Sequence, residues 1–132
     1  MMMLILPSIV ENVTAQKIKE LREILKNMDV EYEREDAAAL AVSNRLFHGT
    51  MEHISDKLRI LRVIDSQEEY IKRFSALTIA SIIRRSNAHA EHHQMLDLLE
   101  ARDLEGLKAL SQHHLDESKE TCLAAVRERH YD

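Results

Sequence analysis

The chain has 132 residues, a net charge of −5, a pI near 5.9 and only 4% aromatic residues. This length is typical of one domain over residues 1–132, and the interspersed acidic and basic residues argue against direct binding of nucleic acid, which needs clustered Lys and Arg. The single Cys122 cannot form an internal disulfide, and the apolar start is too short to span a bilayer, so we expect a cytoplasmic protein with no membrane partner.

The composition predicts an all-α fold, because the chain has two Gly, one Pro and many residues that favour helices. The apolar opening MMMLILPSIV is interpreted as the stub of a packed helix that is truncated at the N-terminus. Thr14 is a suitable N-cap for a helix to about Met28, with an apolar stripe on one face. A polar connection is predicted over residues 29–35. Asp36 then caps a second helix that ends near Gly49.

The next stretch keeps a helical period from Ser55 or Asp56 towards Arg85. Within it, Ser66 and Glu69 match a capping box, which would begin a new helix. The sequence leaves open whether this stretch is one long bent helix or two.

Two more helices complete the prediction. Ser86 and Asn87 indicate a break before the helix AHAEHHQMLDLLEA, and Asp103 is a suitable N-cap for a last helix from Leu104 to about Arg129. Short connections between the elements predict an antiparallel bundle of about five to six helices.

Four polar side chains lie where three of these helices can direct them to one point. Asn44 and His48 are four residues apart and share a helix face. His92 and His114 are 22 residues apart on either side of a charged break, where an antiparallel pair of helices would bring them level. Three imidazoles and one amide oxygen are suitable ligands for a divalent transition metal.

The position of each histidine on its helix distinguishes the three predicted histidine ligands from the other five histidines. A lone histidine on a helix is ordinarily exposed or hydrogen-bonded, but His48, His92 and His114 continue apolar stripes and have no obvious carboxylate partner. Glu91 adjoins His92 but is expected to point about 100° away from the stripe. We therefore predict no buried general base.

Other histidines are weaker candidates. His89 and His93 form an i,i+4 pair that is able to chelate a metal on a helix surface, but their phase places them on the flank of the helix. His113 is adjacent to His114 and rotated about 100° from it. These three are expected at the surface or in support of the metal ligands.

At these residues the chain resembles the effector-binding C-terminal domain of the FadR subfamily of GntR-type bacterial transcription regulators, the FCD domain. The matching segments are NRLFH (44–48), EHHQMLDLLEARD (91–103) and HHL (113–115), and VTAQKIKELREILKNM is similar to an early helix of the family. The spacings from His92 to Asp103 and to His114 match the family pattern. The resemblance covers roughly residues 9–127.

The resemblance implies a zinc or similar divalent ion, with nickel as the alternative, held by Asn44, His48, His92 and His114. It also implies a small organic acid bound at the metal with the help of an arginine, here Arg84 or its neighbour Arg85, and a homodimer. Asn44 stands where the family most often has Asp, which raises the charge of the site by one. The winged helix-turn-helix domain of the family is absent from these residues.

The sequence thus predicts a metal-containing sensor domain, not an enzyme, that binds a carboxylate effector in the open coordination position. Two alternatives remain open. One is a helical oligomerisation domain with structural histidines, and the other is a metal-dependent enzyme, since three histidines and an open position also occur in catalytic zinc sites.

Overall fold

The computed structural model describes residues 2–131, and within them it contains helices and no strands. The helices are α1 (Met2–Asn12), α2 (Ala15–Glu33), α3 (Ala37–Glu52), α4 (Leu58–Ser66), α5 (Glu68–Ala80), α6 (Ile82–Glu100) and α7 (Leu104–Tyr131). The all-α prediction is confirmed. The structure has more helices than expected because the stretch before Arg85 is divided at Gln67 into two helices.

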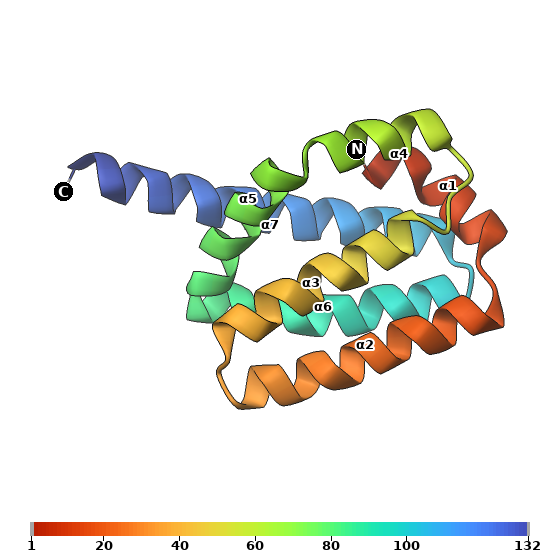
Figure 1. Ribbon diagram of the computed structural model, residues 1–132, viewed down its shortest axis with the longest axis horizontal. Helices are drawn as coiled ribbons and strands as arrows, with labels where there is room; N and C mark the ends of the chain where they lie inside the picture. The colour runs from red at the N-terminus through yellow and green to blue at the C-terminus, as the bar shows by residue number, and fades with distance from the viewer. Residues whose placement is uncertain (1, 132) are drawn as a thin grey trace.

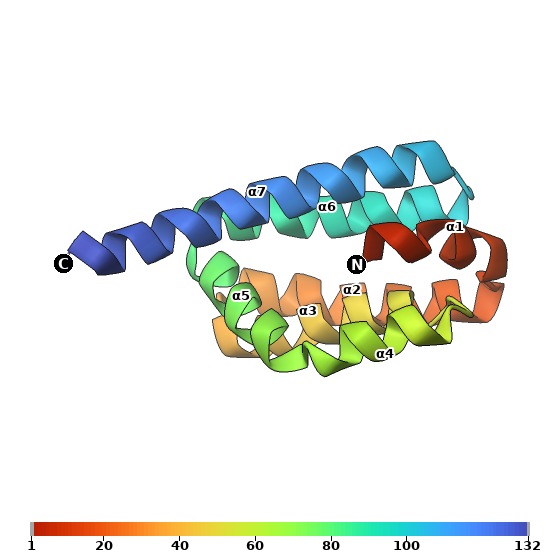
Figure 2. The ribbon, with the colours of Figure 1, turned by 90° about the horizontal axis from the view of Figure 1, so that it is seen from above.

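The helices form an antiparallel bundle, as predicted (Figure 1). Two hairpins make up most of it, one from α2 and α3 and one from α6 and α7, and α2 also packs against α6. Helix α5 crosses one end of the bundle, where it contacts α3, α6 and α7. Figure 2 shows α6 and α7 lying on one side and α3, α4 and α5 on the other. None of the described helices is both long and apolar enough to cross a membrane.

The apolar stripes predicted for the helices form the core. The stripe of α2 is buried in full at Ile18, Leu21, Leu25 and Met28. The opening segment is a packed helix, α1, whose buried side chains include Ile5, Leu6 and Ile9. Phe47 and Met51 of α3 meet this core from the side that also carries the predicted metal ligands.

Three predicted N-caps are confirmed by hydrogen bonds. The Thr14 side chain accepts from the backbone N–H of Lys17 at 3.2 Å, and the Asp36 carboxylate accepts from that of Ala39 at 3.1 Å. Asp103 Oδ1 accepts from the backbone N–H of Gly106 at 2.9 Å. These short-range bonds satisfy backbone donors that have no partner in the first turn of a helix.

Two predicted boundaries are wrong, and the capping box predicted at Ser66 is not formed, although a new helix begins beside it at Glu68. Residues 29–33 continue α2, because side chains of this turn bind α6 and extend the helix. Helix α6 begins after Ser81, whose hydroxyl accepts from the backbone N–H of Arg84, so the residues predicted to break it lie inside it. The capping box is absent, because the Ser66 hydroxyl donates to the carbonyl of Val63 instead.

Candidate metal centre

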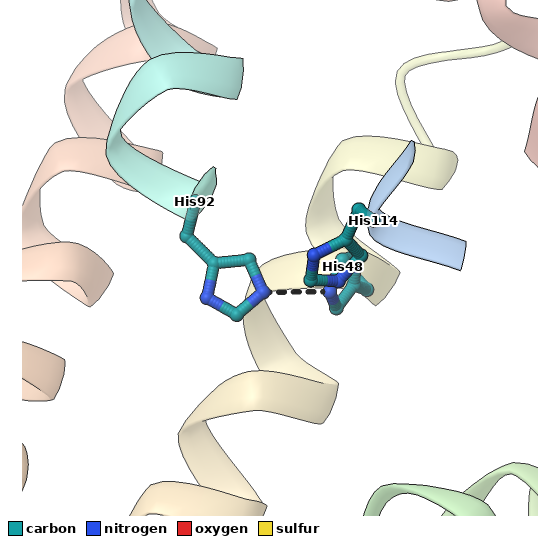
Figure 3. Close-up of side chains that lie close together, drawn as sticks. All are labelled: His48, His92 and His114. Carbon is teal, nitrogen blue, oxygen red and sulfur yellow. Dashed lines mark hydrogen bonds between the residues drawn. The ribbon is translucent and has the colours of Figure 1, made fainter. Parts of the chain in front are cut away.

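Three histidines from three helices meet in the structure, as the sequence predicted. His48 on α3, His92 on α6 and His114 on α7 each offer a ring nitrogen, and these nitrogens all lie within 4.8 Å of one another. Figure 3 shows the three rings converging from separate ribbons. The ring centroids are 4.9 Å apart for His48 and His92, 5.5 Å for His48 and His114, and 5.0 Å for His92 and His114.

The spacing of the nitrogens suits a shared metal ion. The Nε2 atoms of His48 and His92 are 3.1 Å apart. Two nitrogens bonded to one tetrahedral zinc at about 2.0–2.1 Å would lie about 3.3 Å apart. His92 is only 3% exposed, and its Nδ1 is buried without a hydrogen-bond partner among the described residues. The contact with His48 is thus the one hydrogen bond of the His92 ring among the described residues.

The rings of His48 and His92 are both neutral near pH 7. Burial lowers the pKa of His48 well below 6.5, and the nearby positive charges of His114 and Arg45 lower it further. Burial lowers the pKa of His92 in the same way, with added repulsion from neighbouring histidines and Arg84. A neutral imidazole keeps the lone pair that a metal ligand requires. The environment therefore favours the ligating form of both rings.

A buried carboxylate orients the third ring. Glu91 Oε1 lies 2.6 Å from His114 Nδ1, so this nitrogen carries the proton and donates it to the carboxylate. The lone pair of the ring is then on Nε2, which is the arrangement that carboxylates commonly impose on metal-binding histidines. The prediction that Glu91 points away from the interior was wrong, because α7 covers that side of α6 and leaves Glu91 6% exposed.

Arg84 holds the same carboxylate from its other side. Its guanidinium donates to Glu91 Oε1 at 2.6 Å and to Oε2 at 3.2 Å, and its Nη2 also donates to the carbonyl of His114 at 2.9 Å. Burial alone would raise the pKa of Glu91, but hydrogen bonds from His114 and Arg84 and their positive charges lower it to about 2. Arg84 is 4% exposed and uses its donors within the protein. The role of Arg84 in effector binding stays a prediction; in the structure its guanidinium binds Glu91, Ser118 and His114.

The histidines line a cavity of about 290 Å³ to which every described helix contributes. Arg85, the second arginine predicted to bind an effector, lines this cavity, and its Nη1 is 3.5 Å from the carbonyl of Ile79. Asn44 also lines it, one helical turn before His48. Arg45, which no sequence pattern indicated, also lines the cavity and forms an ion pair with Glu68 at 3.3 Å.

Other polar groups in the wall are mostly hydroxyls and amides. The cavity is otherwise apolar, with side chains of α4, α5 and α7 such as Ile64, Ile71 and Leu115. Glu52 is an exception, since its side chain is 6% exposed and burial raises its pKa despite the opposing charges of Arg45 and His53. The cavity thus combines an apolar wall with two arginines and four histidines, His89 among them.

The remaining candidate histidines lie outside this group of ligands. His113 approaches Glu91 Oε2 at 3.5 Å with a side chain that is 59% exposed, which agrees with a surface position. His89 and His93 both contact Asp29 on α2. His113 thus lies at the surface, whereas His89 is mostly buried and also lines the cavity.

Comparisons with known proteins agree with this architecture. The model of the FCD domain family matches residues 3–117. The fold is similar to that of E. coli McbR/YncC, with a TM-score of 0.75, 23% sequence identity and coverage of 97% of this chain. The chain spans 63% of the length of that protein. No curated protein sequence gives a significant match.

Proposed function

The chain belongs to the FCD domain family, and on this premise we propose that it is the effector-sensing domain of a GntR/FadR-type transcription regulator. In this proposal a small organic acid binds in the cavity at a divalent metal, with zinc preferred over nickel. The domain acts in the cytoplasm, as a homodimer, and has no catalytic activity. The single observation that carries the proposal is the convergence of His48, His92 and His114 on the wall of one cavity.

The chemistry of the cavity supports an anionic ligand. His48, His92 and His114, with Asn44, would hold the metal; the environments of His48 and His92 favour their neutral forms, and Asn44 is a neutral amide. A bound divalent cation would supply undiminished positive charge and an open coordination position for a carboxylate. Arg85 would add a guanidinium suited to a second carboxylate or a hydroxyl of the same ligand.

The size of the cavity supports a small ligand. Its volume of about 290 Å³ lies at the lower end of the range for sites that bind small molecules. An acid with a few carbon atoms, such as lactate, malate or citrate, fits this description better than a long-chain acid. The apolar part of the wall would contact the carbon skeleton of the ligand.

The carboxylate nearest to the centre is not placed for catalysis. Glu91 has both oxygens bound by Arg84 and His114, and it does not line the cavity. A pKa of about 2 also makes it a poor proton acceptor at neutral pH. These features support sensing over turnover.

The proposal is tested with tag-free protein from which metal has been removed by a chelator. Zinc binding is measured by elemental analysis after gel filtration, and thermal unfolding is then followed with zinc alone and with zinc plus citrate, lactate, malate or a sugar acid. We expect one of the acids to raise the melting temperature beyond the effect of zinc. At a ligand concentration of 100 times Kd, the stabilisation is about 2.7 kcal/mol.

Two variants separate the roles of metal and arginine. His92→Ala should lose the response to the acid, and Arg85→Gln should retain zinc at the histidines but need more acid for the same shift. His53→Gln is the matched control, because it removes an exposed histidine that is also paired with a carboxylate. An acid response that persists in His92→Ala, or wild-type protein that takes up no metal, would contradict the proposal and favour a structural bundle.

A further inference from the structure

We propose that Asp29, His89 and His93 form a second binding site for a divalent transition metal such as zinc, at the surface between α2 and α6. Its ligands are distinct from those of the cavity centre, although His89 also lines the cavity, and the site is not part of the proposed sensing function. It would connect α2 to α6 through a metal ion. The inference rests on the geometry of the three side chains.

Two histidines of α6 point at a single carboxylate oxygen of α2. The Nε2 atoms of His89 and His93 each lie 2.7 Å from Asp29 Oδ1. The ligand atoms of the three residues are all within 4.8 Å of one another. Because residues four apart share a helix face, α6 presents both imidazoles in the same direction. Two imidazoles and a carboxylate form a common ligand set for zinc and other divalent transition metals.

The local packing holds these ligands in place. The His89 ring stacks on Tyr32 of α2, with centroids 4.7 Å apart and an angle of 7° between the planes. The side chain of His89 is 14% exposed, whereas those of His93 and Asp29 are 43% and 44% exposed. One ligand is thus fixed by packing, and the other two are near enough to solvent for a metal ion to enter and for water to complete its coordination.

The hydrogen-bond partners of the two rings are compatible with a metal. His89 Nδ1 has no hydrogen-bond partner among the described residues, so no second contact requires Nε2 to keep its hydrogen. In the structure, both rings are paired with an oxygen that can accept from each of them. A metal ion would take the place of these two hydrogens and bind the same three atoms, and each neutral ring would then carry its one hydrogen on Nδ1.

This site differs from the cavity centre in its charge. Asp29 supplies a negative charge directly to the ligand set, whereas the histidines of the centre are joined by a neutral amide and Glu91 reaches them only through His114. A cation at Asp29 would therefore attract an anionic effector less strongly. We expect this metal to hold α2 and α6 together. Helix α6 also carries His92, which lies between the ligands His89 and His93 in the sequence.

The experiment counts zinc ions per chain in tag-free protein after saturation and gel filtration. It compares wild type with His93→Gln, which removes a ligand of the surface site, and with His48→Ala, which removes a ligand of the cavity centre. Asp29→Asn is a second variant of the surface site that keeps the shape of the side chain, for use if His93→Gln does not fold. His53→Gln is the control for the loss of a surface histidine.

We expect His93→Gln to bind one zinc ion fewer than wild type, with His53→Gln unchanged. If both sites are real, wild type holds two ions and each single variant holds one. If the cavity centre fails but the surface site exists, wild type and His48→Ala both hold one ion and His93→Gln holds none. The two proposals can thus fail independently.

Thermal unfolding gives a second readout. Zinc should raise the melting temperature of His48→Ala, and this increase should disappear in the double variant with His93→Gln, because the brace between the helices is lost. The inference would be overturned if His93→Gln and Asp29→Asn, both folded, bound as much zinc as wild type with the same affinity. It would equally be overturned if zinc stabilised the double variant as much as His48→Ala.

Discussion

Replacing Glu91 by Gln tests the buried network that orients His114. The substitution keeps the size of the side chain but removes its negative charge. It leaves the guanidinium of Arg84, which is 4% exposed, without a charged partner and changes the acceptor of the His114 N–H. Removing one member of a buried ion pair costs about 3–5 kcal/mol.

The lowered pKa of Glu91 gives an independent value for the contribution of its charge to the free energy of unfolding. The carboxyl group has a pKa of about 2 in the folded protein and an ordinary value of 4.5. At roughly 1.4 kcal/mol for each pH unit between these values, the ionised form stabilises the fold by about 3 kcal/mol. Because the pKa is lowered by folding, this contribution is complete above pH 4.5 and is lost as the pH falls towards 2.

The assay is urea unfolding of metal-free protein with a chelator present, at pH 7 and at pH 3. At pH 7 we expect Glu91→Gln to lower the free energy of unfolding by about 3 kcal/mol, and at pH 3 the difference from wild type should be clearly smaller. Glu20→Gln is the matched control, since it removes a carboxylate from an exposed ion pair with Lys17 and should cost less than about 1 kcal/mol. A loss below 1 kcal/mol for Glu91→Gln, or one that is equal at both pH values, would refute the reasoning.

Two further predictions concern pH and the glycines. Folding lowers the pKa of His48 and His92, mainly through burial and further through nearby positive charge. The stability that depends on their neutral forms is therefore present above pH 6.5 and is lost as the pH falls below it. Urea unfolding of metal-free protein should show this decline between about pH 6.5 and 5, with a shallower slope in His48→Gln. Gly106→Ala should lower the free energy of unfolding in urea by about 1 kcal/mol or more, because the new Cβ would lie 2.6 Å from Asp103 Oδ2 and disturb the N-cap. Gly49→Ala should raise it by up to about 1 kcal/mol, since its Cβ meets nothing within 4 Å in the middle of a helix; equal effects of the two substitutions would contradict this account.

Local rules were sufficient for much of the fold. The caps at Thr14, Asp36 and Asp103 depend on side chains within three residues of the donors that they satisfy, so the sequence displays them directly. The spacing of His92 and His114 is informative for a similar reason. The turn between α6 and α7 is short, with Arg102 at φ 55° and backbone bonds back to Leu98 and Leu99. Residues at similar distances from such a turn lie level on the two helices.

The same local rules failed where contacts between distant segments determine the helix boundaries. The turn after Met28 was expected to be a connection because it is polar, but Asp29 and Tyr32 bind His89 and keep the turn helical. Ser86 and Asn87 resemble a helix break in composition, yet the cap is Ser81. Polar residues on an exposed helix face and polar residues in a loop look alike until the neighbouring elements are known.

The orientation of the Glu91 side chain was predicted wrongly for a related reason. The prediction assumed that α6 has one buried stripe, so a residue 100° from His92 had to face solvent. Helix α6 instead packs against α2, α5 and α7, which bury more than one of its faces. Arg84 and Glu91 are seven residues apart, two turns on one face, and this spacing was the signal that could have identified the pair.

The several faces of α6 also explain how one helix can carry two histidine clusters of different character. His92 faces a cavity with arginines in its wall and has no carboxylate against its ring, so its surroundings favour the neutral form and an anionic ligand. His89 and His93 face a carboxylate that supplies part of the charge a cation needs. A divalent ion among His48, His92 and His114 would keep its full charge for an effector, whereas one at Asp29 would be partly neutralised. The partner that each face of α6 meets, more than the number of histidines, thus decides whether a metal there is suited to recognise an acid or to brace two helices.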